Sequence, residues 1–173
     1  MDRFKGRRTF MALVLAFPFW ARGQACGQPT PRDTEGPFYK PGAPMRASLV
    51  EPGAKGELLV LSGRVLGADC RPVAGAVLDF WHADPQGDYD NAGYRYRGKV
   101  AADAQGAYRL ETILPPPYAG RPRHIHVKVH HPGGKVLTTQ LYFPGEARRE
   151  NPALVVKMAG DRAPRAAGFD FVM

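Results

Sequence analysis

Apolar and polar residues alternate along most of this chain in short runs, a pattern typical of β-strands whose two faces meet different surroundings. Leu58–Leu66 and Val73–Ala83 are two such runs, and residues 67–72 between them have the Gly, Asp and Pro content of a turn. The pattern predicts two strands that pair as a hairpin.

A second pair of runs, Tyr94–Ala101 and Ala107–Leu114, flanks residues 102–106. Gly106 stands near the position at which such a turn needs a positive φ. We therefore expect a second hairpin here.

A third pair of runs, His124–His130 and Val136–Phe143, flanks the segment 131–134 and predicts a third hairpin. Helical patterns are scarce in the chain. Towards the C-terminus, Glu150–Met158 is expected to form one or two helical turns, and Phe169–Val172 a last strand.

These short strands, punctuated by 20 glycines and 17 prolines, predict an all-β fold, namely a single β-sandwich of antiparallel strands with little helix. The sandwich is expected over residues 57–173. Residues 26–56 are rich in Pro and Gly and lack periodicity, so we expect them to lie over the sandwich as an extended N-terminal arm. A chain of 173 residues has room for one such domain.

Residues 1–25 have the composition of an export signal. Four basic residues precede an apolar stretch at 10–20, and small residues at 23–25 form a cleavage site. The pair Arg7-Arg8 favours a twin-arginine signal over an ordinary secretory one. Because the apolar stretch is too short to anchor the chain in a bilayer, we expect a protein exported to the periplasm or the cell exterior, without a stable membrane span.

The chain carries 24 basic and 16 acidic residues, a net charge of +8. Residues 1–25 contain five of the basic residues and one acid, which leaves 19 against 15, or +4, on the rest. No basic run or stacking-aromatic motif occurs, so a nucleic-acid partner is not expected. Cys26 and Cys70 allow a disulfide in an exported protein, while free thiols or lipidation of Cys26 are the alternatives.

Candidate chemistry is concentrated near residues 118–126. On a strand, His124 and His126 point to the same side about 7 Å apart, which suits one metal ion. Tyr118 and Tyr89 are candidates for further ligands, and imidazole combined with phenolate favours a hard ion such as Fe(III) over zinc. Alternating histidines also occur on solvent-facing strands, and zinc or copper at the two histidines is the alternative metal site.

Other residues of the same types have simpler interpretations. The pattern places Phe80 and Trp81 in the core. His82, His130 and His131 are interpreted as packing or surface residues. Tyrosines are common strand residues, and four of them are interpreted as packing residues or cross-strand pairs and not as ligands: Tyr94, Tyr96, Tyr108 and Tyr142.

Several motifs follow one another in the chain. They are Thr34-Glu-Gly-Pro-Phe-Tyr39, Asp79-Phe-Trp81-His-Ala-Asp84, Gly87-Asp-Tyr89, Asp103-Ala-Gln-Gly106-Ala-Tyr108, Tyr118 with Arg121-Pro-Arg-His124-Ile-His126, and Leu137-Thr-Thr-Gln140-Leu-Tyr-Phe143. In this order they resemble the intradiol ring-cleavage dioxygenases, from about residue 34 to residue 145. The number of linked motifs makes the resemblance specific.

The resemblance implies a non-haem Fe(III) dioxygenase with one iron per chain on a β-sandwich core. The implied metal ligands are Tyr89 and His124 in equatorial positions, and Tyr118 and His126 in axial positions. Arg121 and Gln140 match the active-site arginine and glutamine of the family, and Tyr118 is the candidate general base. Pro37 and Phe38 match a loop that lies near the substrate, so both are candidate substrate-binding residues.

The implied substrates are a catecholic aromatic and O2. The implied product is a muconate-type diacid, formed by opening the ring between the two hydroxyl-bearing carbons. The alternative function is an exported β-sandwich module that binds a ligand or a partner without catalytic iron, since one fold hosts many functions. The particular catechol, the oligomeric state and the pathway stay open at this point.

Overall fold

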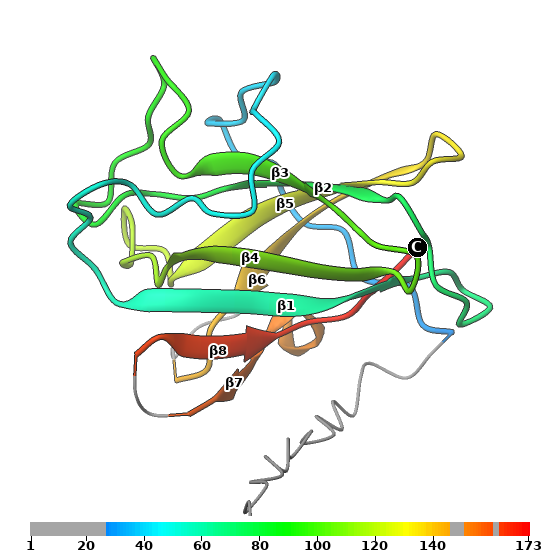
Figure 1. Cartoon of the computed structure of the whole chain (residues 1–173). Helices are drawn as coiled ribbons and strands as arrows, with labels where there is room; N and C mark the ends of the chain where they lie inside the picture. Colours follow the sequence, from blue (N-terminus) through cyan, green and yellow to red (C-terminus); the bar gives the residue numbers. More distant parts are fainter. Residues whose placement is uncertain (1–26, 146–150, 161–162) are drawn as a thin grey trace, which may run out of the picture.

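The computed structural model describes residues 27–145, 151–160 and 163–173, and within them two β-sheets pack face to face (Figure 1). Helix is limited there to one 3-10 turn, so the predicted all-β sandwich is confirmed. None of the helical structure in these ranges is long and apolar enough to cross a membrane. The expected export signal, residues 1–25, and Cys26 lie outside the described residues, whereas Cys70 is disulfide-bonded.

The first sheet has five strands. Its main order is β4 (Ala107–Ile113), β1 (Leu58–Leu66), β8 (Arg165–Gly168) and β7 (Lys157–Ala159), and β9 (Phe171–Val172) also pairs with β1. Strand β1 runs antiparallel to β4 but parallel to β8 and β9. The sandwich is therefore mostly, and not entirely, antiparallel.

The second sheet has four strands and is antiparallel throughout. Its order is β3 (Arg97–Ala101), β2 (Val77–Trp81), β5 (His124–His130) and β6 (Val136–Tyr142). This sheet carries three of the candidate site residues, His124, His126 and Gln140, and the others lie on loops and on the arm.

The core lies between the inner faces of the two sheets. From β5 it takes Ile125, Val127 and Val129, all buried. Burying a side chain of this kind stabilises a fold by roughly 1.5–3 kcal/mol, and a shift by one residue would expose all three at once. The alternation therefore holds His124 and His126 on the outer face of the second sheet.

The third predicted hairpin is confirmed, and the pairing of the first is wrong. Strands β5 and β6 pair with His130 opposite Val136. Strands β1 and β2, by contrast, belong to different sheets. The chain does reverse at 67–72, where the Val73 amide donates to the Val65 carbonyl at 2.9 Å, but it then crosses to the other sheet through buried Val73 and Ala76.

The second predicted hairpin is also wrong in its pairing, because β3 and β4 lie in different sheets. Its turn is present nevertheless. Gly106 has φ +71°, and the Asp103 carboxylate accepts from the amides of Gln105 and Ala107 at 2.8 Å. The turn thus connects the two layers of the sandwich.

The C-terminal segment is less helical than expected. Only Pro152–Leu154 forms a 3-10 turn, which is capped by the Asn151 side chain. Residues 157 and 158, expected to be helical, belong to β7, and the pattern did not indicate β8. The last predicted strand is present but begins at Phe171.

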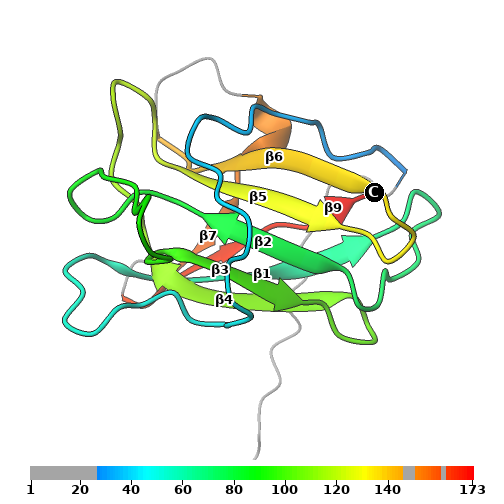
Figure 2. The same ribbon diagram turned by 90° about the horizontal axis from the view of Figure 1, so that it is seen from above.

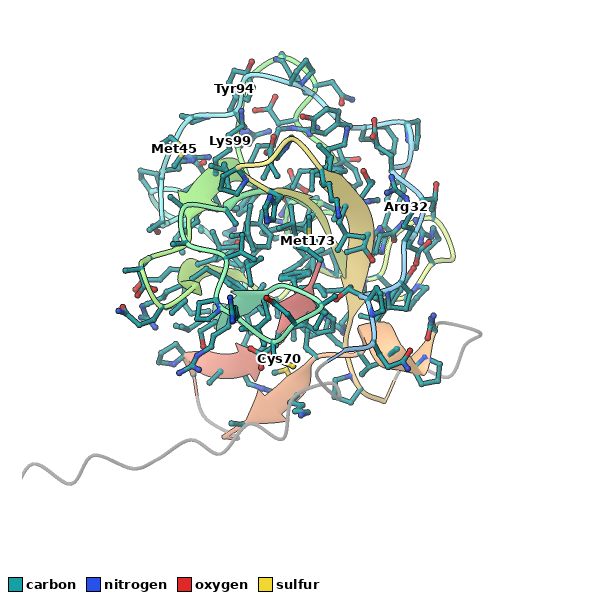
Figure 3. The ribbon with its side chains drawn as sticks, turned by 90° about the vertical axis from the view of Figure 1, so that its right-hand side faces the viewer. Arg32, Met45, Cys70, Tyr94, Lys99 and Met173 are labelled. Atoms are coloured by element: carbon teal, nitrogen blue, oxygen red, sulfur yellow. The ribbon has the colours of Figure 1, made fainter. Side chains whose placement is uncertain are left out.

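The arm crosses the outer face of the second sheet (Figure 2), where the Asp33 amide donates to Thr138 of β6 at 3.1 Å. Further on, Met45 lies beside Lys99 at the β3 edge (Figure 3) and forms a bridge with it. The Leu49 amide then donates to Glu111 of β4 at 2.8 Å. These bonds cover the outer edges of both β3 and β4, which would otherwise expose unpaired backbone groups.

His82 connects the end of β2 to β4 and is fully buried. Its Nδ1 lies 2.7 Å from the Ala83 carbonyl and must donate to it, so Nε2 accepts from the Thr112 hydroxyl at 2.6 Å. Burial lowers the pKa of His82 to about 4. The side chain is therefore neutral in the folded protein near neutral pH.

The low pKa of His82 predicts that the folded protein loses stability in mild acid. The pKa of His82 in the folded protein, about 4, lies below the ordinary value of 6.5. The contribution of neutral His82 to the stability of the fold is therefore complete above pH 6.5 and falls as the pH drops towards 4. We expect His82→Gln to be less stable than the parent protein near neutral pH. On acidification, the variant should lose less of its free energy of unfolding than the parent does, and this difference should be on the order of 1–3 kcal/mol. Urea unfolding at several pH values measures both effects.

His131→Gln, in the β5–β6 turn, is the control for loss of a histidine. Its stability profile is the reference with which the profile of His82→Gln is compared. Parallel stability profiles for the parent and His82→Gln would contradict the role given to His82.

Candidate functional site

The outer face of the second sheet carries one row of side chains that crosses all four strands. Trp81 lies opposite Arg97 on one side and His126 on the other, and His126 lies opposite Gln140. In the neighbouring row, His124 lies opposite Tyr142. The strand register therefore places residues from distant parts of the chain next to one another.

The two histidine rings are 4.8 Å apart between centroids. Nδ1 of His124 donates to the Pro122 carbonyl at 2.7 Å, which fixes the proton on that nitrogen. Nε2 of His124 is then an acceptor, and the Tyr89 hydroxyl donates to it at 3.3 Å. One imidazole nitrogen and one phenol oxygen thus converge.

Tyr89 reaches this position from a loop that follows β2. The Asp84 carboxylate organises the loop by accepting from the amides of Gln86 at 2.9 Å and Asp88 at 3.0 Å. The Tyr89 ring lies 5.5 Å from the ring of Tyr118 and 6.0 Å from that of His126. The structure therefore brings together all four residues that the sequence suggested as metal ligands.

Tyr118 and Arg121 occupy the two ends of a tight turn. Each backbone amide donates to the carbonyl of the other residue, at 3.2 and 2.7 Å. The central residues Ala119 and Gly120 both have positive φ, +45° and +73°, as in a type I′ turn. This conformation costs a residue such as Ala about 1–3 kcal/mol, and the two backbone hydrogen bonds hold Tyr118 and Arg121 next to each other.

Arg121 is oriented by a chain of hydrogen bonds. Its Nη2 donates to Gln140 Oε1 at 2.7 Å and to the Tyr142 hydroxyl at 3.3 Å. The Tyr142 hydroxyl donates to the Asp33 carboxylate at 2.9 Å, and Gln140 Nε2 donates to the Thr34 carbonyl at 2.6 Å. Tyr142 is buried and lies opposite His124 across the strands, as its interpretation as a packing or cross-strand residue expects. Its hydroxyl has the further role of orienting Arg121, which only its position two residues after Gln140 could have indicated.

The arm forms one wall of the site. Phe38 stacks on Tyr89, with the ring centroids 4.5 Å apart, and meets the Tyr118 ring edge-on at 5.8 Å. Pro37, the other candidate on this loop, is exposed. Gly36 has φ +69°, and a Cβ there would lie 3.2 Å from Cε1 of His126, so the backbone approaches the imidazole closely because the residue is glycine.

Trp81 supports His126 on the outer face. It is buried, as expected, but in a second hydrophobic cluster on this face and not between the two sheets. The two rings stack nearly parallel, with centroids 4.8 Å apart and planes 7° apart. Tyr39 of the arm covers Trp81 at 4.9 Å. Phe80 does lie in the core, so the two neighbours separate as strand alternation requires.

Burial controls the charge of the candidate ligands. It lowers the pKa of His126 to about 2, helped by the nearby His124 and Arg121, and it also lowers the pKa of His124. It raises the pKa of Tyr89 to about 12. The imidazoles therefore keep free lone pairs over the physiological range, and the Tyr89 phenol keeps its proton unless a metal ion binds its oxygen.

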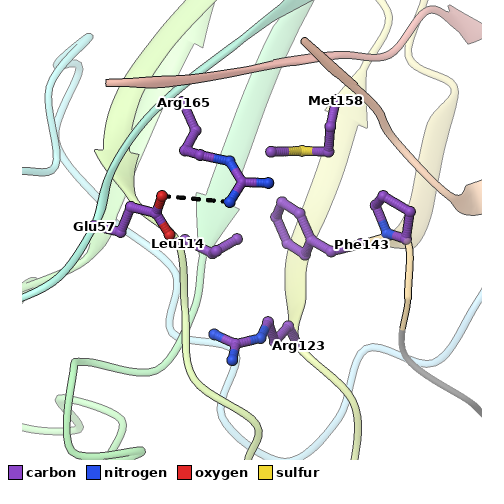
Figure 4. A pocket seen from close by; sticks show the side chains of 7 residues that line it. Glu57, Leu114, Arg123, Phe143, Met158 and Arg165 are labelled. Atoms are coloured by element: carbon purple, nitrogen blue, oxygen red, sulfur yellow. Dashed lines mark hydrogen bonds and ion pairs between the residues drawn. The ribbon is translucent and has the colours of Figure 1, made fainter. Parts of the chain in front are cut away.

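Two cations that the sequence places near the site point elsewhere. Arg123 lines a separate pocket between the sheet ends (Figure 4), where Arg165 and Glu57 form an ion pair of 3.4 Å. Lys128 pairs with Glu35 at 2.6 Å and lies over the Tyr39 ring. Neither cation belongs to the tyrosine and histidine cluster.

Comparison with known proteins agrees with this geometry. A family model described as a dioxygenase, Dioxygenase_C, matches residues 34–159. The chain belongs to the intradiol ring-cleavage dioxygenase family.

Two curated relatives show the level of similarity. The chain is 38% identical over 136 residues to a chlorocatechol 1,2-dioxygenase of Pseudomonas sp. (strain P51), a match that covers 64% of this chain and 54% of that protein. It is 34% identical over 143 residues to catechol 1,2-dioxygenase 2 of Acinetobacter lwoffii, covering 68% and 52%. The chain thus spans about half the length of these relatives.

A solved structure covers more of both chains. The dioxygenase domain of a dioxygenase and carbohydrate-binding protein fusion from Streptomyces sp. SirexAA-E superposes with a TM-score of 0.81 at 47% identity, covering 84% of this chain and 98% of that one. The 3-chlorocatechol 1,2-dioxygenase of Rhodococcus opacus 1CP superposes with a TM-score of 0.74 at 28% identity, covering 86% and 74%.

The close approach of Gly36 to His126 predicts a local effect of a single methyl group. Gly36→Ala and Gly53→Ala both place a Cβ at a φ near +70°, but only the first Cβ meets a neighbour, since nothing lies within 4 Å of the second. We expect Gly53→Ala to lose about 1 kcal/mol of stability from backbone strain.

Gly36→Ala should lose more, and it should also shift the NMR signals of the His126 ring. Thermal unfolding and histidine NMR spectra of the two variants give the comparison. Equal stability losses with unchanged His126 signals would refute the close approach.

Proposed function

We propose that this protein is a non-haem Fe(III) enzyme that opens catecholic rings between the two hydroxyl-bearing carbons and adds both atoms of O2, giving a muconate-type diacid. The observation that carries the proposal is the convergence of two imidazoles and two phenols on the outer face of one sheet. Membership of the intradiol family and the catechol and chlorocatechol dioxygenases among its relatives support the same chemistry.

The donor set suits a ferric ion. The neutral, buried imidazoles of His124 and His126 supply nitrogen lone pairs without a proton to displace near neutral pH. Phenolate oxygen is a hard anionic donor, which a trivalent ion prefers and a structural zinc site does not. The residues that would hold the iron are Tyr89, Tyr118, His124 and His126.

Ferric iron, when bound, supplies the Lewis acidity and one-electron redox chemistry that allow a catecholate to react with O2. Of the two phenols, Tyr118 is the less buried, so its Oη is suited to accept the proton of a substrate hydroxyl. Tyr89, which is buried under Phe38, is suited to stay in place. The two tyrosines therefore have different tasks.

Arg121 is the residue suited to stabilise negative charge that develops on the ring. Its guanidinium stays cationic, and hydrogen bonds to Gln140 and Tyr142 fix its orientation before substrate arrives. Phe38 and Pro37, on the arm, would form the wall beside the substrate ring. This wall is apolar, as an aromatic substrate requires.

The reaction predicts a defined product. Iron-loaded protein supplied with catechol and isotopically labelled O2 should consume one O2 per catechol and give an open-chain diacid with one labelled oxygen in each carboxylate. Mass spectrometry of the product measures this. Arg121→Gln should keep its iron and lose on the order of 10²-fold in kcat, as when one charge-stabilising donor is removed.

An iron-loaded protein that leaves both catechol and chlorocatechol unchanged would contradict the proposal and would favour a binding module. A product opened outside the two hydroxyl-bearing carbons would contradict it too.

Because Tyr89 is more deeply buried than Tyr118, we expect the phenylalanine variants of the two residues to differ in iron retention. Tyr89→Phe should lose most of its iron during dialysis against a chelator, because it removes the buried donor. Tyr118→Phe should keep more iron, with a changed visible charge-transfer band and low activity. Tyr94→Phe, whose hydroxyl donates to Pro41 away from the site, is the control and should resemble the parent.

Metal analysis, visible spectra and turnover of these variants decide the assignment. Full activity in both Tyr89→Phe and Tyr118→Phe would overturn it.

A further inference from the structure

Arg97 is a buried cation whose role the preceding chemistry does not explain. It is only 1% exposed, although it carries a permanent charge. Within the described residues no carboxylate pairs with it, since the nearby Asp90 carboxylate pairs with Arg95 and accepts from backbone amides. Burying a charge without such a partner is costly, so the arrangement requires an explanation.

The guanidinium of Arg97 joins two loops that border the site. Its Nε donates to the Asp90 carbonyl at 2.9 Å, and its Nη1 donates to the Phe38 carbonyl at 2.6 Å. Asp90 directly follows Tyr89 in the chain, and Phe38 stacks on the Tyr89 ring. One side chain therefore fixes the backbone beside Tyr89 and the residue that covers it.

Arg97 also lies against Tyr89 itself. The guanidinium carbon is 5.9 Å from the centroid of the Tyr89 ring. The strand register places Arg97 at the β3 end of the row that continues through Trp81 to His126. The third nitrogen, Nη2, is buried and has no hydrogen-bond partner among the described residues.

We propose that Arg97 is a positioning residue for Tyr89. By binding the Asp90 and Phe38 carbonyls it holds Tyr89 in the ligand position, and its guanidinium places a positive charge near the Tyr89 ring. This inference rests on the proposed function, because it concerns a tyrosine that binds iron. Arg97 does not touch the substrate or the metal in this account. It acts through Tyr89.

The two contributions of Arg97 predict two separable effects. Holding the loops should affect iron retention, since residues that orient metal ligands typically change metal affinity by about 10–100-fold. The positive charge stabilises electrons on the Tyr89 phenolate, so removing it should move the phenolate-to-iron charge-transfer band to lower energy.

The experiment compares iron-loaded parent protein with Arg97→Gln and Arg97→Lys. Arg97→Gln should retain iron at least about tenfold less strongly against a chelator and should show the band at lower energy. Arg97→Lys keeps the charge, but one ammonium group does not reproduce the fork that binds both carbonyls, so its band should stay near that of the parent while retention falls.

Arg46→Gln is the matched control. Arg46 also donates from a partly buried guanidinium to backbone carbonyls of this region, those of Arg97 and Tyr94, but it has no contact with the Tyr89 ring. A general loss of loop order would affect Arg46→Gln and Arg97→Gln alike. The proposal predicts parental band energy and parental iron retention for Arg46→Gln.

Parental band energy and retention in Arg97→Gln would overturn this inference and leave the proposed function standing. A parent protein that binds no iron and shows no band would overturn both. If circular dichroism shows Arg97→Gln to be unfolded, Arg97→Lys decides: reduced retention with a parental band supports the role, and parental retention overturns it.

Discussion

The alternation of side chains along β5 is the constraint on which the rest of the site depends. Ile125, Val127 and Val129 must face the core, and their burial leaves His124 and His126 no position other than the outer face. Antiparallel pairing then places Trp81 and Gln140 on either side of His126. The hydrophobic core thus determines the spacing of the polar site.

Loops and the arm complete the site on the sheet, and they orient its side chains mainly through backbone carbonyl groups. Pro122 fixes the proton of His124, Thr34 binds Gln140, and Phe38 and Asp90 bind Arg97. Carbonyl groups orient a side chain without adding a charge of their own. The result is a set of donors that burial keeps neutral, so the strongest charge in the site would come from the ion it binds.

Much of the fold was visible in the sequence because a period of two specifies a strand and its buried face. The same period does not specify the partner strand. For this reason the sequence predicts hairpins of β1 with β2 and of β3 with β4, although the two strands of each pair lie in different sheets. The burial of Trp81 was predictable, but the pattern does not show that the arm, and not the other sheet, covers this residue. The β5–β6 hairpin was predictable because its turn is short and its strands are adjacent.

The candidate ligands could be named from residue type and family motifs, whereas the residues that orient them could not. Tyr142 and Arg97 are ordinary strand residues by pattern, and their roles appear only when the register brings them beside Arg121 and Tyr89.

Iron-edge anomalous diffraction from crystals of the iron-loaded protein locates the metal itself. We expect one iron peak per chain, in contact with Tyr89, Tyr118, His124 and His126. A peak elsewhere, or no peak beside His124 and His126 in protein shown to contain iron, would contradict this expectation.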